Sequence, residues 1–285
     1  MAHLGQLARQ RADVTALVVV SERDGQLHEV SLGYAELERK VRALASRLQR
    51  FARGERALLL LENDEHYVIS FFACLYAGLV AVPVFPPESL RPQHMARLLG
   101  IARDARPGCV LTTRELEDAL SATLAESFDA SVVSVDVVAD SSAEGFTPSL
   151  PNGDDVAFLQ YTSGSTSSPK GVMVTHDNLM ANSRAIEEGL GVKPEDVFVS
   201  WLPLFHDMGL VGGLLQPIHR GIKLVLMSPR FFIERPQRWL EAIARHRGTI
   251  AGAPNFAYRM LLERVTDAQL EGLESVELAR CFLRL

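Results

Sequence analysis

The sequence has 285 residues, of which 47% are hydrophobic and 22% are charged, and its formal net charge is −6. This length and composition suffice for one large domain or two joined subdomains, and they exclude a disordered chain. The acidic balance argues against a general nucleic-acid binder, which needs a basic face, although a local basic pocket for a polyanion remains compatible with it.

The first half of the chain predicts alternating helices and strands. Residues 16–31 predict a hairpin that turns at Asp24 and Gly25. From 34 to 51 apolar residues recur every three or four positions, which is typical of one helix face. Further helices are expected at 66–77, 92–105 and 114–127, and short apolar strands at 57–61, 79–85, 109–113 and 131–135. Repeated helix-then-strand units predict an α/β fold with mostly parallel sheets flanked by helices.

Residues 139–155 are rich in Ser, Gly, Pro and Asp and predict a linker. This linker would divide the chain into a first α/β subdomain at 1–138 and a second at 156–285. In the second, we expect strands at 156–161, 171–175, 197–202, 222–227 and 248–253, and helices at 177–189, 236–246 and from 255 onward. The last residues, 279–285, are typical of a strand opening, so the fold is expected to continue beyond them.

Three isolated thiols, Cys74, Cys109 and Cys281, favour a reducing compartment and buried core positions over a disulfide framework. A nucleophilic thiol is the alternative. The longest apolar stretch, 71–85, contains Gly and Pro and is shorter than the ~20 residues of a membrane span. We therefore expect a cytoplasmic protein without a transmembrane segment. The scattered histidines lack metal-ligand spacing, so no structural zinc is predicted.

The segment YTSGSTSSPKG, residues 161–171, lies between two predicted strands. Its small residues allow consecutive N–H groups to converge on an anion, while hydroxyls and a lysine add donors. Gly164 and Gly171 are expected to supply backbone angles that other residues resist. Neither GxxxxGK[ST] nor GxGxxG is present, so this is a different phosphate-binding turn, the alternative being a solvated Ser/Thr linker. The residues expected to bind the nucleotide are Thr162, Ser163, Gly164, Ser165, Thr166, Lys170 and Gly171.

A second segment, WLPLFHDMGLVGGLLQP at 201–217, places His206 before a helix that Asp207 can cap. Gly209 and two later glycines would leave one face of this helix without side chains. This leaves room either for a ligand or for the close approach of another backbone segment. Taken alone, His206 is better interpreted as a histidine whose hydrogen bonds are satisfied at a helix start.

Together these segments resemble the adenylate-forming enzymes, which include acyl-CoA synthetases and nonribosomal peptide adenylation domains. Within that superfamily the chain is most similar to the fatty acyl-AMP ligases, from about residue 34 to 258. The segments that carry the similarity are YAGLVAVPVFPP, FLQYTSGSTSSPKGVMVTHDNL, WLPLFHDMGLVGGLLQP, LMSPRFFIERPQRWLEAI and GAPNFAY.

The resemblance implies that a fatty-acid carboxylate attacks the α-phosphorus of ATP, giving an acyl-adenylate and pyrophosphate. Lys170 and the turn would hold the β- and γ-phosphates together with Mg²⁺, and His206 would orient the carboxylate. The implied substrate-binding residues are His206, Asp207, Gly209, Asn255 and Phe256. An acyl carrier protein is the implied acceptor, with CoA as the alternative.

The aromatic residues Trp201, Trp239 and Phe256 are expected in the core, and residues 252–258 either wall an acyl tunnel or pack as ordinary core. Members of the family extend well beyond this chain, with further adenine-binding residues and a lid lysine. We therefore expect the chain alone to be weakly active or inactive. A long-chain acyl-CoA ligase and a non-catalytic nucleotide- or lipid-binding module remain as alternatives to the acyl-AMP ligase.

Overall fold

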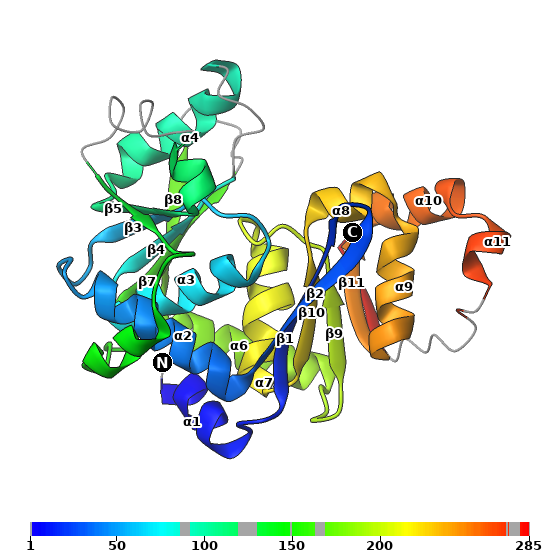
Figure 1. Cartoon of the computed structure of the whole chain (residues 1–285), viewed down its shortest axis with the longest axis horizontal. Helices are drawn as coiled ribbons and strands as arrows, with labels where there is room; N and C mark the ends of the chain where they lie inside the picture. Colours follow the sequence, from blue (N-terminus) through cyan, green and yellow to red (C-terminus); the bar gives the residue numbers. More distant parts are fainter. Residues whose placement is uncertain are drawn as a thin grey trace. The chain divides into compact units, whose positions relative to one another are not determined.

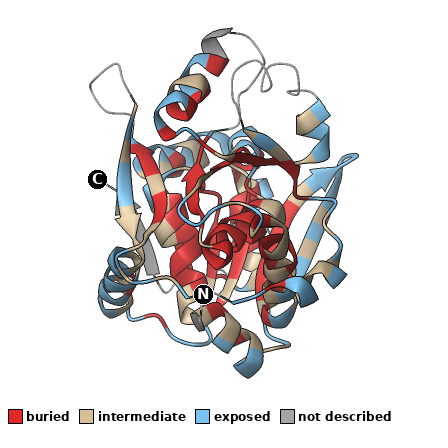
Figure 2. Cartoon of the chain, turned by 90° about the vertical axis from the view of Figure 1, so that its left-hand side faces the viewer, coloured by how far each residue is buried: buried red, intermediate tan, exposed pale blue. Residues whose placement is uncertain are grey.

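The computed structural model describes residues 2–85, 92–118, 130–148, 150–162, 169–271, 273 and 280–284. These residues form two six-stranded, mainly parallel sheets with helices packed on them (Figure 1). Buried residues are concentrated on the strands and on the helix faces that cover them (Figure 2). The predicted α/β class with mostly parallel sheets is confirmed.

The chain divides into two compact units. The first comprises Glu38–Glu62 and His66–Asn182 together with the first residues of the chain. The second comprises Gln6–Leu37, Asn63–Glu65 and Ser183–Leu285.

The sheet of the first unit has the strand order β6-β5-β3-β4-β7-β8. Its strands are β3 (Arg56–Leu59), β4 (Val80–Pro83), β5 (Cys109–Thr112), β6 (Ser131–Ser134), β7 (Val156–Thr162) and β8 (Lys170–Thr175). All pairs are parallel except β7 and β8, which form an antiparallel hairpin. The prediction that the turn joins two strands is thereby confirmed, and β8 lies at one edge of the sheet, as β6 does at the other.

The helices described in the first part of the chain include those expected at 34–51, 66–77 and 92–105, whereas α1 was not predicted. They are α1 (Ala2–Gln10), α2 (Tyr34–Leu48), α3 (Glu65–Ala77) and α4 (Pro92–Ala105). In α3 every residue from Tyr67 to Ala77 is buried, which explains its continuous apolar sequence. In α4 Met95, Leu98 and Ile101 pack with strand residues in one hydrophobic cluster. The predicted helix at 114–127 lies largely outside the described residues.

The second unit contains the sheet β12-β11-β9-β10-β1-β2. Its strands are β1 (Thr15–Arg23), β2 (Gln26–Gly33), β9 (Val197–Ser200), β10 (Lys223–Met227), β11 (Ile250–Pro254) and β12 (Arg280–Arg284). Only β1 and β2 are antiparallel. Asp24 (φ 51°) and Gly25 (φ 75°) form their turn, and two positive φ angles are what a tight hairpin with right-handed strand twist requires.

Helices of the later part of the chain connect these strands. They are α6 (His176–Leu190), the π-helix η2 (Met208–Leu215), α7 (Gln216–Arg220), α8 (Pro229–Glu234), α9 (Gln237–His246), α10 (Asn255–Arg264) and α11 (Asp267–Leu270). In Figure 1 α8 and α9 lie beside the strands of the second sheet. Between them Trp201 stacks on Phe232 at 4.0 Å between ring centroids, and Trp239 meets both rings edge-on. The predicted core positions of Trp201 and Trp239 are confirmed.

The observed division of the chain differs from the predicted one at 139–155. The strands β7 and β8 follow the expected linker yet complete the first sheet, while β1 and β2 precede it yet belong to the second. Within the expected linker, the 3₁₀ helix η1 (Asp140–Gly145) is followed by the buried Phe146, whose ring lies 5.5 Å from that of Tyr76. Parallel strands pair through crossovers, so local composition does not reveal which segments share a sheet.

Candidate functional site

The predicted phosphate-binding turn joins β7 to β8. Ser163, Gly164, Ser165 and Thr166 lie outside the described residues. The described ends of the turn are paired, with Thr162 opposite Lys170 and Tyr161 opposite Gly171. Both Thr162 and Lys170 are exposed at this end of the hairpin. The arrangement presents a cation and a hydroxyl side by side, which suits a polyphosphate.

Helix α4 supports the hairpin on both sides of Lys170. The ring of the buried Tyr161 covers Gly171, where an added Cβ would lie 2.9 Å from the Tyr161 Cζ. The Tyr161 hydroxyl donates to Asp104 Oδ2 of α4 at 2.5 Å. On the other side, Pro169 packs on α4 at Gly100, where a Cβ would lie 3.2 Å from its Cγ. Residues bound to α4 therefore flank the lysine.

The reason for glycine at position 171 differs from the one predicted. Gly171 is absent from the glycines with positive φ among the described residues, so no unusual backbone angle demands it. Instead the Tyr161 ring occupies the space that a side chain would need. Burial and the neighbouring Asp104 raise the pKa of Tyr161, so its hydroxyl remains a donor.

We expect Tyr161→Phe to lower the free energy of unfolding by about 1 kcal/mol, the usual contribution of one hydrogen bond. The substitution removes the contact with Asp104 but keeps the ring over Gly171. Urea denaturation of the chain measures the change. Asp104→Asn, which retains an acceptor at this position, is the matched control and should cost less. A Tyr161→Phe chain as stable as the wild type would contradict this role.

The sequence did not single out Asp104 or Gly100. An isolated glycine inside the predicted helix 92–105 is a weak signal of close packing, and it marks the place where Pro169 contacts α4. Nothing local connects Asp104 with Tyr161, because the two are 57 positions apart.

In the second unit, His206 lies between β9 and η2 and faces its neighbour Asp207. The His206 Nδ1 is 2.6 Å from Asp207 Oδ1, and the same oxygen accepts the Met208 N–H at 2.7 Å. Asp207 is therefore the N-cap of η2, as predicted. Both side chains are about half exposed. The Met208 N–H also lies 3.4 Å from the His206 Nδ1, so this nitrogen faces both the Asp207 carboxylate and the first N–H of η2.

Gly209 allows η2 to lie against the segment before it. A Cβ on this residue would lie 2.2 Å from the Pro203 carbonyl oxygen and 2.7 Å from its carbon. The same carbonyl accepts the His206 N–H at 3.1 Å, and the His206 carbonyl accepts the Leu210 N–H at 2.8 Å. Two reasons were expected for glycine at this position, room for a ligand or the close approach of another backbone segment. The structure supports the second. Short π-helices of this kind frequently occur at functional sites.

Asn255 and Phe256 begin α10 directly after β11, and both are exposed. The prediction that Phe256 is a core residue is wrong, because half of its surface is exposed. Its ring still contacts the edge of the aromatic cluster, 5.9 Å from that of Trp201. The strand-to-helix junction turns this side chain outward, whereas Ala257 points into the core. An exposed aromatic beside a buried cluster is compatible with an apolar ligand.

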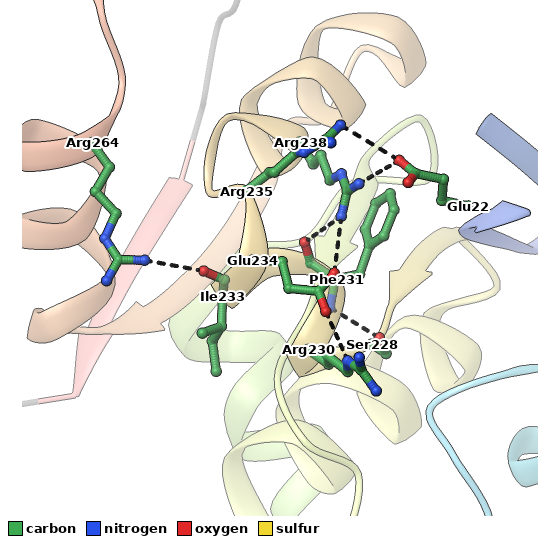
Figure 3. A network of polar contacts seen from close by, with 9 residues as sticks. All are labelled: Glu22, Ser228, Arg230, Phe231, Ile233, Glu234, Arg235, Arg238 and Arg264. Atoms are coloured by element: carbon green, nitrogen blue, oxygen red, sulfur yellow. Dashed lines mark hydrogen bonds and ion pairs between the residues drawn. The ribbon is translucent and has the colours of Figure 1, made fainter. Parts of the chain in front are cut away.

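A polar network links α8 and α9 to the C-terminal end of β1 (Figure 3). The buried Arg238 of α9 donates to Glu22 of β1 and to the Phe231 carbonyl of α8, the latter at 3.2 Å. Its guanidinium also lies 4.0 Å from the centre of the Phe231 ring. At the start of α8, Ser228 Oγ accepts the Phe231 N–H and caps the helix. The network thus fixes the helix that carries Phe232.

The two cysteines whose side chains are described, Cys74 and Cys109, are buried. Burial raises the pKa of Cys74 well above its usual value and that of Cys109 to about 12. Because the thiolate is the reactive form, neither is suited to nucleophilic catalysis. Helices in the described parts of the chain are all too short or too polar to cross a membrane.

The described site residues fall into two sets. Thr162, Lys170 and Gly171 belong to the first compact unit, whereas the second contains His206, Asp207, Gly209, Asn255 and Phe256. Each set is assembled from segments that its own sheet and helices hold.

Comparisons with known proteins identify similar chains. A sequence model described as AMP-binding enzyme matches residues 5–281. The medium-chain-fatty-acid–acyl-carrier-protein ligase JamA of Moorena producens is 40% identical over 258 residues, which cover 88% of this chain and 44% of that protein. The long-chain-fatty-acid–AMP ligase FadD32 of Mycolicibacterium smegmatis is 38% identical over 270 residues, covering 90% and 42%.

A solved structure supports the same similarity. The fatty acyl-adenylate ligase from L. pneumophila, in complex with acyl adenylate and pyrophosphate, matches with a TM-score of 0.91 and 31% identity. The match covers 99% of this chain and 49% of that one. The chain therefore spans about half the length of the relatives that it matches.

Proposed function

Because the chain belongs to the AMP-binding enzyme family, we propose that it helps to convert a fatty acid and ATP into an acyl-adenylate and pyrophosphate. The observation that carries the proposal is Lys170, exposed at the end of the β7–β8 hairpin and flanked by two residues that α4 holds. Similarity to ligases of medium-chain and long-chain fatty acids supports a fatty acid as the substrate.

The reaction brings two anions together, so its barrier is largely electrostatic. A carboxylate oxygen bonds to the α-phosphorus, the bond from this phosphorus to the bridging oxygen breaks, and pyrophosphate leaves with the electron pair. Lys170 Nζ and the Thr162 hydroxyl would bind phosphate oxygens and stabilise the charge of the leaving group. Mg²⁺ that accompanies ATP would neutralise further phosphate charge. The exposed cation and hydroxyl fit such a ligand.

His206 would orient the attacking carboxylate through Nε2–H while Asp207 accepts from Nδ1. Asn255 and Phe256, exposed at the start of α10, are proposed to contact the substrate, with Phe256 providing apolar surface for the acyl chain. For the acceptor we propose the phosphopantetheine thiol of an acyl carrier protein, because one relative bears that acceptor in its name. CoA is the alternative acceptor.

Fatty-acid-dependent exchange of labelled pyrophosphate into ATP tests the proposal. The assay is made on the chain itself and on a fusion that joins it to the C-terminal half of the L. pneumophila ligase, with that ligase as positive control. We expect exchange in the fusion that requires a fatty acid, and little or none in the chain alone. Adding a holo acyl carrier protein or CoA to preformed acyl-adenylate then identifies the acceptor. A folded fusion that binds ATP without any exchange would instead support a non-catalytic nucleotide-binding module.

A further inference from the structure

Asn63 is a buried polar residue that the functional motifs do not include. It lies between β3 and α3 and is only 6% exposed. Its Nδ2 donates to the Leu202 carbonyl at 2.8 Å, and its Oδ1 accepts the Leu204 N–H at 3.1 Å. One side chain thus binds two backbone groups of opposite polarity, in a segment 139 and 141 positions away.

The segment that Asn63 binds leads directly into His206. Between its two partners lies Pro203, whose carbonyl accepts the His206 N–H at 3.1 Å. The same carbonyl rests against Gly209 of η2, where no Cβ could be accommodated. Asn63 binds the Leu202 and Leu204 backbone, and Gly209 of η2 packs against the Pro203 carbonyl between them. The backbone of His206 is therefore placed by a segment with little freedom to shift.

The chemistry of the amide explains why asparagine suits this position. Asn offers a donor and an acceptor on one short, flat group, as the Leu202 carbonyl and the Leu204 N–H require. Asp would accept from Leu204 but could not donate to Leu202, and Ala would leave both buried backbone groups unpaired. The segment would then move to find other partners.

We propose that Asn63 is a positioning residue that holds His206 in the orientation needed to align the substrate carboxylate. The role of His206 in this statement rests on the proposed function. The placement of the Leu202–Leu204 segment by Asn63 does not, and it can be tested without activity.

Hydrogen exchange of the chain tests the placement directly. In Asn63→Ala we expect the Leu204, His206 and Leu210 amides to exchange about 10-fold faster or more, because their hydrogen bonds depend on this segment. Amides of β1 and β10 should keep their wild-type rates, which separates local loosening from global unfolding. Asn182→Ala, which removes an exposed amide in α6, is the matched control. Unchanged exchange at Leu204 and His206 would overturn the placement.

Kinetics of the fusion test the consequence. We expect Asn63→Ala to lower kcat for fatty-acid-dependent exchange about 10- to 100-fold, since small misplacements of a catalytic group have effects of this size. The KM for ATP should stay within about 2-fold, because the phosphate-binding residues are untouched. Asn63→Asp, which retains the bond with Leu204, should be less impaired. If kcat fell and the KM for ATP rose by similar factors, the substitution would have destabilised the fold in general. That result would overturn the positioning role.

A double-mutant cycle with His206→Ala completes the test. If Asn63 acts through His206, adding Asn63→Ala to His206→Ala changes the remaining rate by no more than about 2-fold. Additive losses would overturn the proposal. If the wild-type fusion shows no fatty-acid-dependent exchange, the proposed function fails, and the exchange rates of the Leu204 and His206 amides still decide whether Asn63 places this segment.

Discussion

Replacing Gly209 by alanine should disrupt acyl-adenylate formation more than a single methyl group would suggest. The new Cβ would lie 2.2 Å from the Pro203 carbonyl oxygen, and both atoms belong to the backbone, so the chain itself must shift. Overpacking of this kind destabilises proteins by about 1–3 kcal/mol. The displaced carbonyl is the acceptor of the His206 N–H. We therefore also expect kcat to fall about 100-fold, because His206 moves with it.

Urea denaturation of the chain and pyrophosphate exchange in the fusion measure the two effects. Gly189→Ala is the matched control, because Gly189 lies in α6 with no atom within 4 Å of an added Cβ. There alanine should stabilise the helix by roughly 0.5–1 kcal/mol. A Gly209→Ala fusion with wild-type kcat would contradict the placement of His206 by this contact.

Local patterns in the sequence predicted individual elements accurately. The helix expected at 92–105 is observed at Pro92–Ala105, and the hairpin turns at Asp24 and Gly25 as expected. Hydrophobic period and turn chemistry are properties of neighbouring residues, so a short window contains the information that fixes them. The cap formed by Asp207 could be predicted for the same reason.

The features that position the site could not be predicted in this way. The pairing of β7 with β4 and of β1 with β10 joins segments that are distant along the chain. The two hydrogen bonds of Asn63 likewise span 139 and 141 positions. Such contacts follow from the packing of whole elements, and the sequence near Asn63 contains no sign of its partners. Motifs identify the candidate site residues, while residues distant along the chain set the geometry of those residues.

The same distinction applies to the β7–β8 hairpin, which is proposed to bind phosphate. Its sequence predicts the lysine and the hydroxyls, but not the dependence of Gly171 on the Tyr161 ring or the support that Asp104 provides. Nor does the sequence indicate that Pro169, directly before the lysine, packs on Gly100 of α4. The position of Lys170 thus depends on a helix that ends well before β7 begins.

Lys170→Ala should cause the largest loss of activity among substitutions in the hairpin. The lysine is exposed at its end, opposite Thr162, and the proposal assigns it to the phosphates of ATP. Removing one preorganised donor to a developing negative charge typically lowers kcat about 10²- to 10³-fold. We expect a loss of this size in pyrophosphate exchange by the fusion, with a raised KM for ATP and an unchanged KM for the fatty acid. Stability should hardly change, because the side chain is exposed.

Two further variants separate charge from geometry. Lys170→Arg keeps the positive charge but replaces a compact ammonium by a planar guanidinium, so we expect partial activity. Lys193→Ala removes the same charge from an exposed position in the second unit, and its exchange rate should equal that of the wild type. If Lys170→Ala and Lys193→Ala had the same rate, Lys170 would contribute only to net charge. The hairpin would then have no part in binding the leaving pyrophosphate.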